Sequence, residues 1–163
     1  MAGKACSDTG PILHLHEIKE LFLLKVFDKV FISTNIKEEL LKYEIENLSG
    51  NIVLKKINND QTALLAERYG LDIGESSVIW LCKSLDVFLL LTDDLTAREA
   101  AIELELKPVG SVGIILRCFR EKTITSRRAI DSLRLLQAKS SLFITTELIN
   151  YAVAEVKKFK GLH

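Results

Sequence analysis

The stretch "VFLLLTDD", Val87 to Asp94, joins an apolar run to two adjacent acidic residues. The run from Val87 to Leu91 is typical of a short strand with both faces buried, as found in parallel sheets. Asp93 and Asp94 follow at the point where this strand ends. Ligands of open parallel sheets bind outside the carboxyl ends of the strands. The stretch therefore predicts a buried parallel strand with an acidic site at its end.

Strand-like and helix-like segments alternate on both sides of this stretch. Four more strands are predicted, at Lys4–Asp8, Lys29–Ser33, Asn51–Ile57 and Lys107–Gly110. Helices are predicted from Pro11 and over Lys19–Phe27, Asn35–Ile45, Asp60–Tyr69, Asp72–Leu85 and Leu95–Leu104. After Gly110 only helices are predicted, over Val112–Arg120, Ser126–Ala138 and Thr146–Phe159. This order predicts one α/β domain over residues 1–163, with a parallel sheet covered on both faces and a helical C-terminal extension from about residue 123.

The composition is that of a globular protein, with 48% hydrophobic and 27% charged residues. Because 22 basic residues balance 22 acidic ones, contact with nucleic acid would need a local basic patch. The three cysteines are far apart and odd in number, which favours a reducing compartment over a disulfide framework. No apolar run is long enough for a membrane helix, and the first residues lack a signal-peptide pattern. A cytoplasmic protein without membrane contact is therefore expected.

Acidic residues recur where a site of an α/β protein would lie. Asp8 ends the first predicted strand, as Asp93 and Asp94 end the later one. Glu75 stands three and four residues before apolar positions of its helix, which places it on the inward face. Asp72 and Glu75 also fit a capping box, which is the structural alternative for Glu75.

Helix starts offer alternative roles for several of these acids. Thr96 and Glu99 form a capping-box pattern, and aspartate is also a common N-cap. If Thr96 caps the helix, neither Asp93 nor Asp94 is needed for capping; if Asp94 caps it, Asp93 is still not needed. Asn35 and Glu38 likewise form a capping pair. The helical periodicity alone does not separate Glu38 from the neighbouring Glu39, and both fit a solvated helix face.

If these acids share one cleft, like charges raise their pKa values unless a cation compensates. No His or Cys cluster with metal-ligand spacing accompanies them, which argues against zinc. Oxygen ligands alone suit Mg²⁺ or Mn²⁺, and a metal-bound water can attack a phosphodiester. The residues by themselves therefore indicate metal-dependent phosphodiester hydrolysis.

Five motifs in order extend this hypothesis. They are "SDTGPI" after the first strand, "EEL" on a following helix, "LDIGESSVIWLC", "LLLTDD" and "KPVGSVGIILRCFREKTIT". In this order the chain resembles PIN-domain proteins, and in particular the VapC-type toxin ribonucleases. The resemblance implies a three-layer α/β/α sandwich with a central parallel sheet, and Mg²⁺- or Mn²⁺-dependent RNA cleavage. It also implies a homodimer and an antitoxin protein as a partner.

The resemblance assigns the candidate site residue by residue. The catalytic acids would be Asp8, Glu39, Glu75 and Asp94, and the metal would be held by Asp8, Glu75 and Asp94. Glu39 matches the helix glutamate of the family better than Glu38 does, and Glu75 stands where aspartate is often found. The supporting residues would be Ser7, Thr9, Thr92 and Asp93.

Basic residues suggest where RNA would bind. Between Arg117 and Lys139 there are seven lysines and arginines against two acids, and Arg98 follows the acidic pair by one helical turn. A solvated helix face is the alternative explanation of this pattern. The candidates for phosphate contact are Arg98, Arg117, Arg120, Arg127 and Arg128.

Other functional classes share single motifs with the chain. "DTG" at Asp8 also occurs in aspartic proteases, but those are β-proteins, whereas a helix is predicted here from Pro11. An acidic pair also marks response-regulator receiver domains, but there it ends the first strand. The alternative that stays open is a non-catalytic PIN-fold binding or assembly module.

Overall fold

A computed structural model describes residues 3–160 and contains one five-stranded parallel sheet. The strands are β1 (Lys4–Ser7), β2 (Lys29–Ser33), β3 (Ile52–Lys55), β4 (Leu89–Leu91) and β5 (Lys107–Val109). Their order across the sheet is β3-β2-β1-β4-β5, and every neighbouring pair is parallel. The predicted parallel α/β fold is therefore confirmed.

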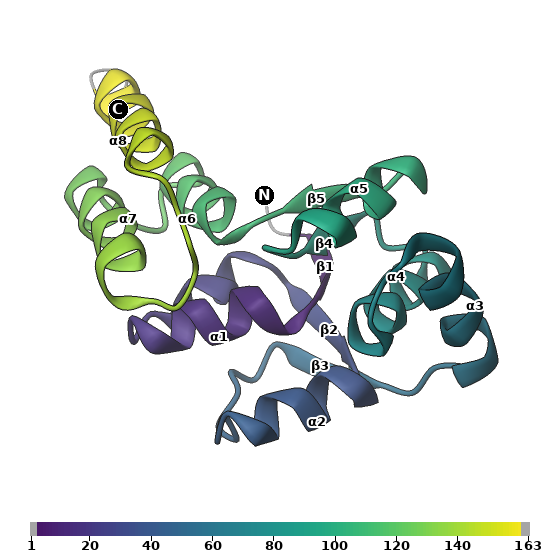
Figure 1. Ribbon diagram of the computed structural model, residues 1–163. Coiled ribbons are helices and arrows are strands. Elements are labelled where there is room, and N and C mark those ends of the chain that lie inside the picture. The colour runs from purple at the N-terminus through teal and green to yellow at the C-terminus, as the bar shows by residue number, and fades with distance from the viewer. Residues whose placement is uncertain (1–2, 161–163) are drawn as a thin grey trace.

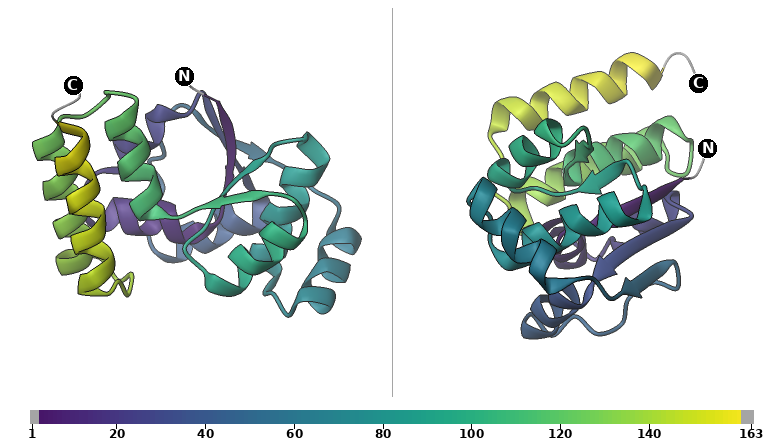
Figure 2. Two further views of the ribbon diagram at one scale, coloured as in Figure 1. Left: turned by 90° about the horizontal axis from the view of Figure 1, so that it is seen from above. Right: turned by 90° about the vertical axis from the view of Figure 1, so that its right-hand side faces the viewer.

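Helices cover both faces of the sheet. They are α1 (Thr9–Glu17), the 3₁₀ helix η1 (Leu21–Val26), α2 (Thr34–Lys42), α3 (Asn59–Tyr69), α4 (Ile73–Leu85), α5 (Leu95–Glu103), α6 (Ser111–Arg120), α7 (Ser126–Lys139) and α8 (Thr146–Lys160). Helices α3, α4 and α5 lie on one side of the sheet, and α1, α6, α7 and α8 lie on the other (Figures 1 and 2). Helix α4 packs directly on β1, β2 and β4, which makes it the central helix of its layer. This arrangement is the predicted α/β/α sandwich.

The strand order creates a switch point between β1 and β4. The chain proceeds outward from β1 to β2 and β3, and then returns to the other side of β1 to form β4 and β5. Ser7 lies opposite Leu91 in the register of the two central strands, and the amide of Asp8 donates a 2.8 Å hydrogen bond to the Leu91 carbonyl. Asp8 and the residues after Leu91 therefore leave the sheet side by side, in the crevice where ligands of open α/β sheets bind.

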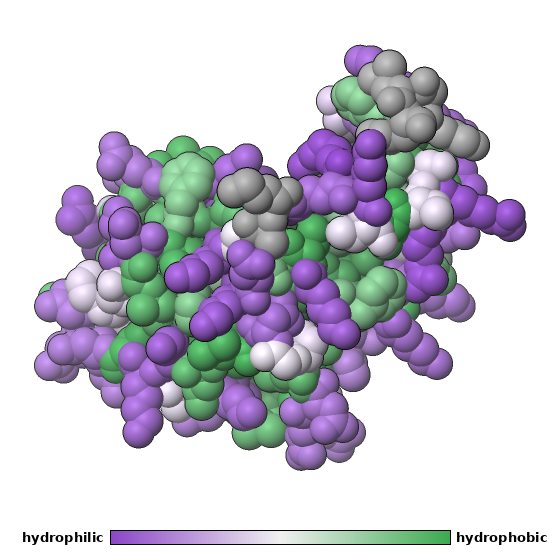
Figure 3. Space-filling model, turned by 180° about the vertical axis from the view of Figure 1, so that it is seen from behind, coloured by the Kyte–Doolittle hydropathy of each residue, from purple (hydrophilic) through white to green (hydrophobic). Residues whose placement is uncertain are grey.

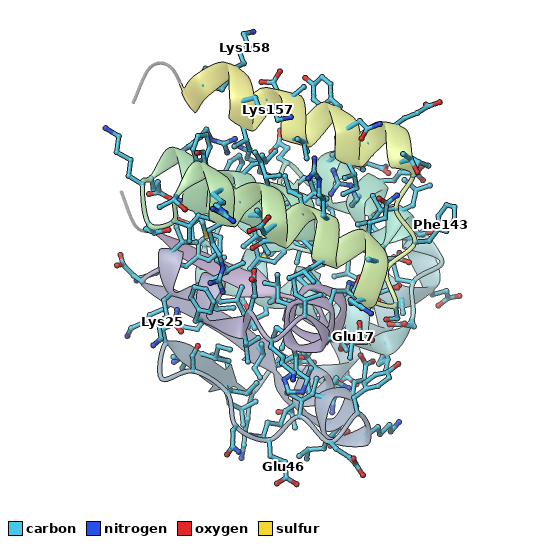
Figure 4. All side chains as sticks on the ribbon, turned by 90° about the vertical axis from the view of Figure 1, so that its left-hand side faces the viewer. Glu17, Lys25, Glu46, Phe143, Lys157 and Lys158 are labelled. Atoms are coloured by element: carbon cyan, nitrogen blue, oxygen red, sulfur yellow. The ribbon has the colours of Figure 1, made fainter. Side chains whose placement is uncertain are left out.

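The C-terminal helices are packed onto the sheet domain. The buried residues Ile149, Ala152, Val153 and Val156 of α8 belong to the same hydrophobic cluster as the sheet. Helix α8 packs on α7 and α6, and α7 in turn contacts α1 and α6 (Figure 4). Seen from behind, the surface carries mainly hydrophilic side chains with apolar patches between them (Figure 3). No helix within residues 3–160 has the length and apolar character required to cross a membrane.

Several helix starts differ from the prediction. Helix α1 begins at Thr9, two residues before Pro11, with Asp8 as its N-cap. The segment predicted as a helix over Lys19–Phe27 is only a short 3₁₀ helix, because Lys19 adopts a left-handed conformation (φ 59°) that separates it from α1. Helix α2 is capped by Ser33, so the predicted cap at Asn35 is wrong.

Helix α5 begins at Leu95, as predicted. Asp94 is its N-cap, and the Ala97 amide donates a 2.8 Å hydrogen bond to the Asp94 carboxylate. Of the two caps that the sequence allowed, Asp94 is the one formed, while Thr96 and Glu99 are exposed. Aspartate is a better N-cap than threonine, and in the helix capped by Asp94 the residues Ala97, Ala100 and Ala101 are buried.

Candidate active site

Asp8 lies at the junction of β1 and α1, where hydrogen bonds fix both its backbone and its carboxylate. Its carboxylate accepts one bond from the Thr9 amide (2.8 Å) and one from the Thr92 hydroxyl (3.1 Å). The side chain is only 7% exposed. The preceding Ser7 is fully buried, and its hydroxyl donates to the Asp8 carbonyl at 2.8 Å. The strand ends thus hold one carboxylate rigidly at the edge of the sheet.

Glu75 lies in the first turn of α4 and is half-buried. Its amide donates to Asp72 at 2.7 Å, and its own Oε2 accepts from the Asp72 amide at 3.1 Å, so the capping box is formed. The cap and the inward-facing position are therefore not alternatives, because the same side chain does both. The capping box turns the Glu75 carboxylate back over the helix start, beside Asp72.

Glu39 reaches the same region from α2. Its carboxylate accepts a hydrogen bond from the Thr9 hydroxyl, while Glu38 is exposed. The structure thereby separates the two glutamates, which the periodicity did not. Glu39 also packs over Gly74 so closely that a Cβ at position 74 would collide with its Oε1. A glycine at this helix start is therefore required to leave Glu39 in its place.

Asp93 has a different role from the neighbouring Asp94. Its carboxylate accepts hydrogen bonds from His14 Nδ1 (2.7 Å), the Ser111 amide (2.7 Å) and the Ser111 hydroxyl (2.5 Å). The bonds join the end of β4 to α1 and to the start of α6. Gly110 makes this possible, because a Cβ there would lie 2.7 Å from Asp93 Oδ1. Asp93 is neither a helix start nor an uncommitted acid.

These side chains surround one cavity of about 690 Å³, which we call the acidic cavity. Its acidic lining consists of Asp8, Glu39, Asp72, Glu75, Asp93 and Asp94. Sequence reasoning missed four polar lining residues as site members: His14, Lys42, Tyr43 and Asp72. No local pattern could indicate His14, because its partner Asp93 is 79 positions away in the sequence. The sequence indicated Asp72 only as a helix cap.

The electrostatics of the cavity follow from burial and like charges. The pKa of Asp8 is raised from 3.8 to about 7, and burial is the main cause. The charges of Glu39 and Asp72 also raise this pKa, whereas the hydrogen bonds from Thr9 and Thr92 lower it. Burial likewise raises the pKa of Glu75 from 4.5 to about 7, with further contributions from Asp72, Asp94 and Asp8. Both shifts show that burial, and to a smaller extent the neighbouring carboxylates, disfavour the charged forms of Asp8 and Glu75.

The donor chemistry of the cavity fits a hard divalent cation. Within residues 3–160, no lysine or arginine forms an ion pair with Asp8, Glu39, Glu75 or Asp94. Carboxylate oxygens are the preferred ligands of Mg²⁺ and Mn²⁺. In the same part of the chain, no three His, Cys, Asp or Glu side chains already form a metal-binding group. The acids that line the cavity are therefore chemically suitable ligands, and their carboxylate oxygens would have to move closer together to bind one ion.

The five arginines proposed to contact RNA lie in two places outside the acidic cavity. Arg98, Arg117 and Arg120 line a second cavity of about 540 Å³, next to the acidic one. Arg117 also stacks on Phe27 (4.8 Å from the ring centroid) and pairs with Glu121 at 2.8 Å. Arg127 and Arg128 line a separate depression.

Arg128 has a structural role in this depression. It forms a 3.0 Å ion pair with Glu20, which is 3% exposed and also accepts a hydrogen bond from Ser132. Sequence reasoning missed Glu20 altogether. The pair anchors α7 to the segment that precedes η1.

A crevice at the carboxyl ends of β1 and β4, lined by acids from four segments of an α/β/α sandwich, defines a PIN-like fold with an acidic centre. A family model described as PIN domain matches residues 4–158, nearly the whole chain, so the chain belongs to the PIN-domain family. No curated protein matches it. PIN domains are generally nucleases that bind nucleic acid and use divalent metal ions.

Proposed function

We propose that this PIN domain is a metal-dependent endoribonuclease that hydrolyses RNA phosphodiester bonds. The observation that carries the proposal is the convergence of Asp8, Glu39, Glu75 and Asp94 on one cavity without a basic ion-pair partner among residues 3–160. Uncompensated buried carboxylates are costly, and a bound cation offsets that cost. Together with membership of the PIN family, this favours a metal-loaded hydrolytic site.

In this proposal Asp8, Glu75 and Asp94 would hold Mg²⁺ or Mn²⁺, and the ion would supply activation of water and charge stabilisation at the phosphate. The chain itself fixes the ligands. Thr9 and Thr92 orient the Asp8 carboxylate, and the helix caps orient Glu75 and Asp94. Glu39 Oε1 has no hydrogen bond within the described residues, so this oxygen is available to accept a proton.

The direct test is the Asp8→Asn variant, assayed on a fluorescent single-stranded RNA with Mn²⁺ and with EDTA. We expect the wild-type protein to cleave in Mn²⁺ only, and the variant to lose at least about 100-fold in rate while staying folded by circular dichroism. Asp86→Asn is the matched control, since Asp86 is exposed at the opposite end of α4. Equal cleavage by wild-type protein in EDTA would contradict the proposal.

A non-catalytic binding module is the second candidate, and one observation favours it. Asp8, Glu75 and Asp94 each serve as part of a helix N-cap, so all three have a structural reason to be present. A module of this kind would bind RNA or a protein but would show no Mn²⁺-dependent cleavage. The wild-type cleavage assay separates the two candidates, because only the nuclease turns over.

The proposal extends to partners on the basis of the family resemblance. A VapC-type toxin would act as a homodimer, and an antitoxin would inhibit it. Light scattering of the purified chain would test the dimer, with a mass near twice 18.3 kDa expected. Growth arrest on induced expression, absent in the Asp8→Asn variant, would test the toxin role.

A further inference from the structure

A second cavity adjoins the acidic one and differs from it in charge. This basic cavity, about 540 Å³ in volume, runs along the edge strand β5 and the face of α6. It shares the lining residues Asp93 and Leu142 with the acidic cavity, so the two cavities are adjacent. Its floor is apolar, formed by residues such as Val109, Val112 and Leu116.

Three cations of the basic cavity have no ion-pair partner. Arg98 comes from α5, Lys107 from β5 and Arg120 from the end of α6, and none forms a salt bridge within residues 3–160. Lys107 and Arg120 are exposed and Arg98 is half-exposed. Arg98 lies beside Gly110 at the start of α6, since a Cβ on Gly110 would lie 3.3 Å from Arg98 Nη1, and Arg120 is the last residue of the same helix. The ten residues of α6 are about 15 Å long at 1.5 Å per residue, so the charges are spread over more than one phosphate of a nucleic-acid strand.

An aromatic side chain stands at the rim of this cavity. Phe143 is 89% exposed, although phenylalanine is normally buried, and Figure 4 shows it projecting from the connection between α7 and α8. The connection itself is tethered. Ser141 donates two hydrogen bonds to Glu17 of α1 (3.0 and 2.8 Å), and Gln137 donates to the Ile144 carbonyl. Phe143 is thus an exposed ring on a fixed backbone, which reduces the entropy lost when it binds a flat partner.

We infer that the basic cavity binds the single-stranded RNA on one side of the scissile phosphate, with one base stacked on Phe143 and the backbone along Arg98, Lys107 and Arg120. The inference rests on the proposed nuclease function for its position relative to the cleaved bond. Sites for single-stranded nucleic acid combine a cationic track with aromatic rings. The basic cavity adjoins the acidic centre, which is where the strand on one side of a cleaved phosphate has to lie.

The stacking part is tested by binding a labelled single-stranded RNA of about 10 nucleotides to the full chain in EDTA, followed by fluorescence anisotropy. Phe143→Ala and Phe143→Leu should each weaken binding about 5- to 100-fold, and Phe143→Trp should restore it. Phe88→Ala is the matched control, because Phe88 is 60% exposed but lines neither cavity. Equal binding by Phe143→Leu and wild type would overturn base stacking.

The electrostatic part is tested by the salt dependence of the same binding. The triple variant Arg98→Gln, Lys107→Gln, Arg120→Gln should lower the slope of log affinity against log salt by about 2. A control triple variant, Lys25→Gln, Lys157→Gln, Lys158→Gln, removes the same charge from residues outside both cavities (Figure 4) and should leave the slope unchanged. An equal change in both triple variants would overturn the assignment of the track.

These outcomes are independent of cleavage. If cleavage in Mn²⁺ is absent but binding depends on Phe143 and the three cations, the nuclease proposal fails and the binding site stands. If cleavage occurs but neither set of variants changes binding, the nuclease stands and the RNA site is wrong. A third outcome concerns polyglutamate as a competitor of the labelled RNA. If polyglutamate displaces the RNA, and if its own affinity falls as much as that of RNA when Phe143 is replaced, the cavity binds an acidic protein segment and the inference is overturned.

Discussion

The acidic and the basic residues proposed from the sequence are arranged very differently. All four acids, Asp8, Glu39, Glu75 and Asp94, line one cavity. The five arginines divide between two places, and Arg128 belongs to a buried ion pair. Asp8 and Asp94 follow strand ends and Glu75 lies in the first turn of α4, whereas Glu39 lies in the middle of α2 and reaches the cavity through the packing of that helix. The arginines lie on helices, whose faces are oriented only by packing. A residue at the end of a parallel strand is therefore placed by topology, whereas one on a peripheral helix is not.

The largest expected effect concerns the free energy of unfolding at the acidic site. Because the pKa of Asp8 rises to about 7 on folding, the folded protein binds more protons than the unfolded one between about pH 4 and 7, so its stability falls as pH rises through that window. Glu75 contributes in the same direction. In EDTA, Asp8→Asn should be more stable than wild type at about pH 8, by on the order of 2–4 kcal/mol, and no more stable near pH 4. Urea unfolding at the two pH values measures this.

The control for that experiment is Asp86→Asn, which should follow the wild-type pH dependence. If Asp8→Asn and wild type keep a constant difference across the window, Asp8 is not the buried, uncompensated acid described above. Addition of Mn²⁺ should narrow the difference at about pH 8, because an ion that binds only the folded wild type stabilises it.

The next effect distinguishes two adjacent glutamates. Glu39→Gln should lower the rate of RNA cleavage about 100-fold, because the change removes a carboxylate that lines the cavity. Glu38→Gln should change the rate less than about twofold, since Glu38 is exposed and outside the cavity. Single-turnover cleavage measures both. Equal losses would show that general charge, and not the position of Glu39, determines activity.

A smaller effect is expected from the basic residues that are not near the acids. Arg128→Gln should reduce the free energy of unfolding by about 1–3 kcal/mol, because it leaves the buried Glu20 carboxylate without its cation. It should leave RNA affinity unchanged. Arg127→Gln is the neighbouring control, since Arg127 forms no ion pair within the described residues. A loss of RNA affinity at unchanged stability would instead assign Arg128 to the substrate track.

The smallest effect tests the close contact between α2 and α4. Gly74→Ala should displace the Glu39 carboxylate and lower cleavage about tenfold. Stability should change by less than about 1 kcal/mol, since the flexible end of Glu39 can move and alanine favours the helix. Unchanged cleavage would show that Glu39 does not act from its observed position. Gly50→Ala, with open space around position 50, is the control.

Much of the fold was predictable because each segment carried its own signal. Apolar runs and helical periodicity located all five strands and the main helices, and the capping box of Asp72 and Glu75 is local in sequence. Helix starts were less predictable where two local caps competed. Thr96 with Glu99 matched the capping pattern, but Asp94 capped the helix because the end of β4 fixes where the chain turns.

The sequence by itself determined the alternation of strands and helices, and with it the edge of the sheet at which Asp8 and Asp94 meet. Only the tertiary structure decided that Glu39 and not Glu38 faces the cavity, that Asp93 joins His14 to Ser111, and that Phe143 stands exposed beside a basic groove. The physical reason is the distance along the sequence over which each interaction acts. Local hydrogen bonds and periodicity act within a few residues, whereas these contacts join segments 18 to 79 positions apart.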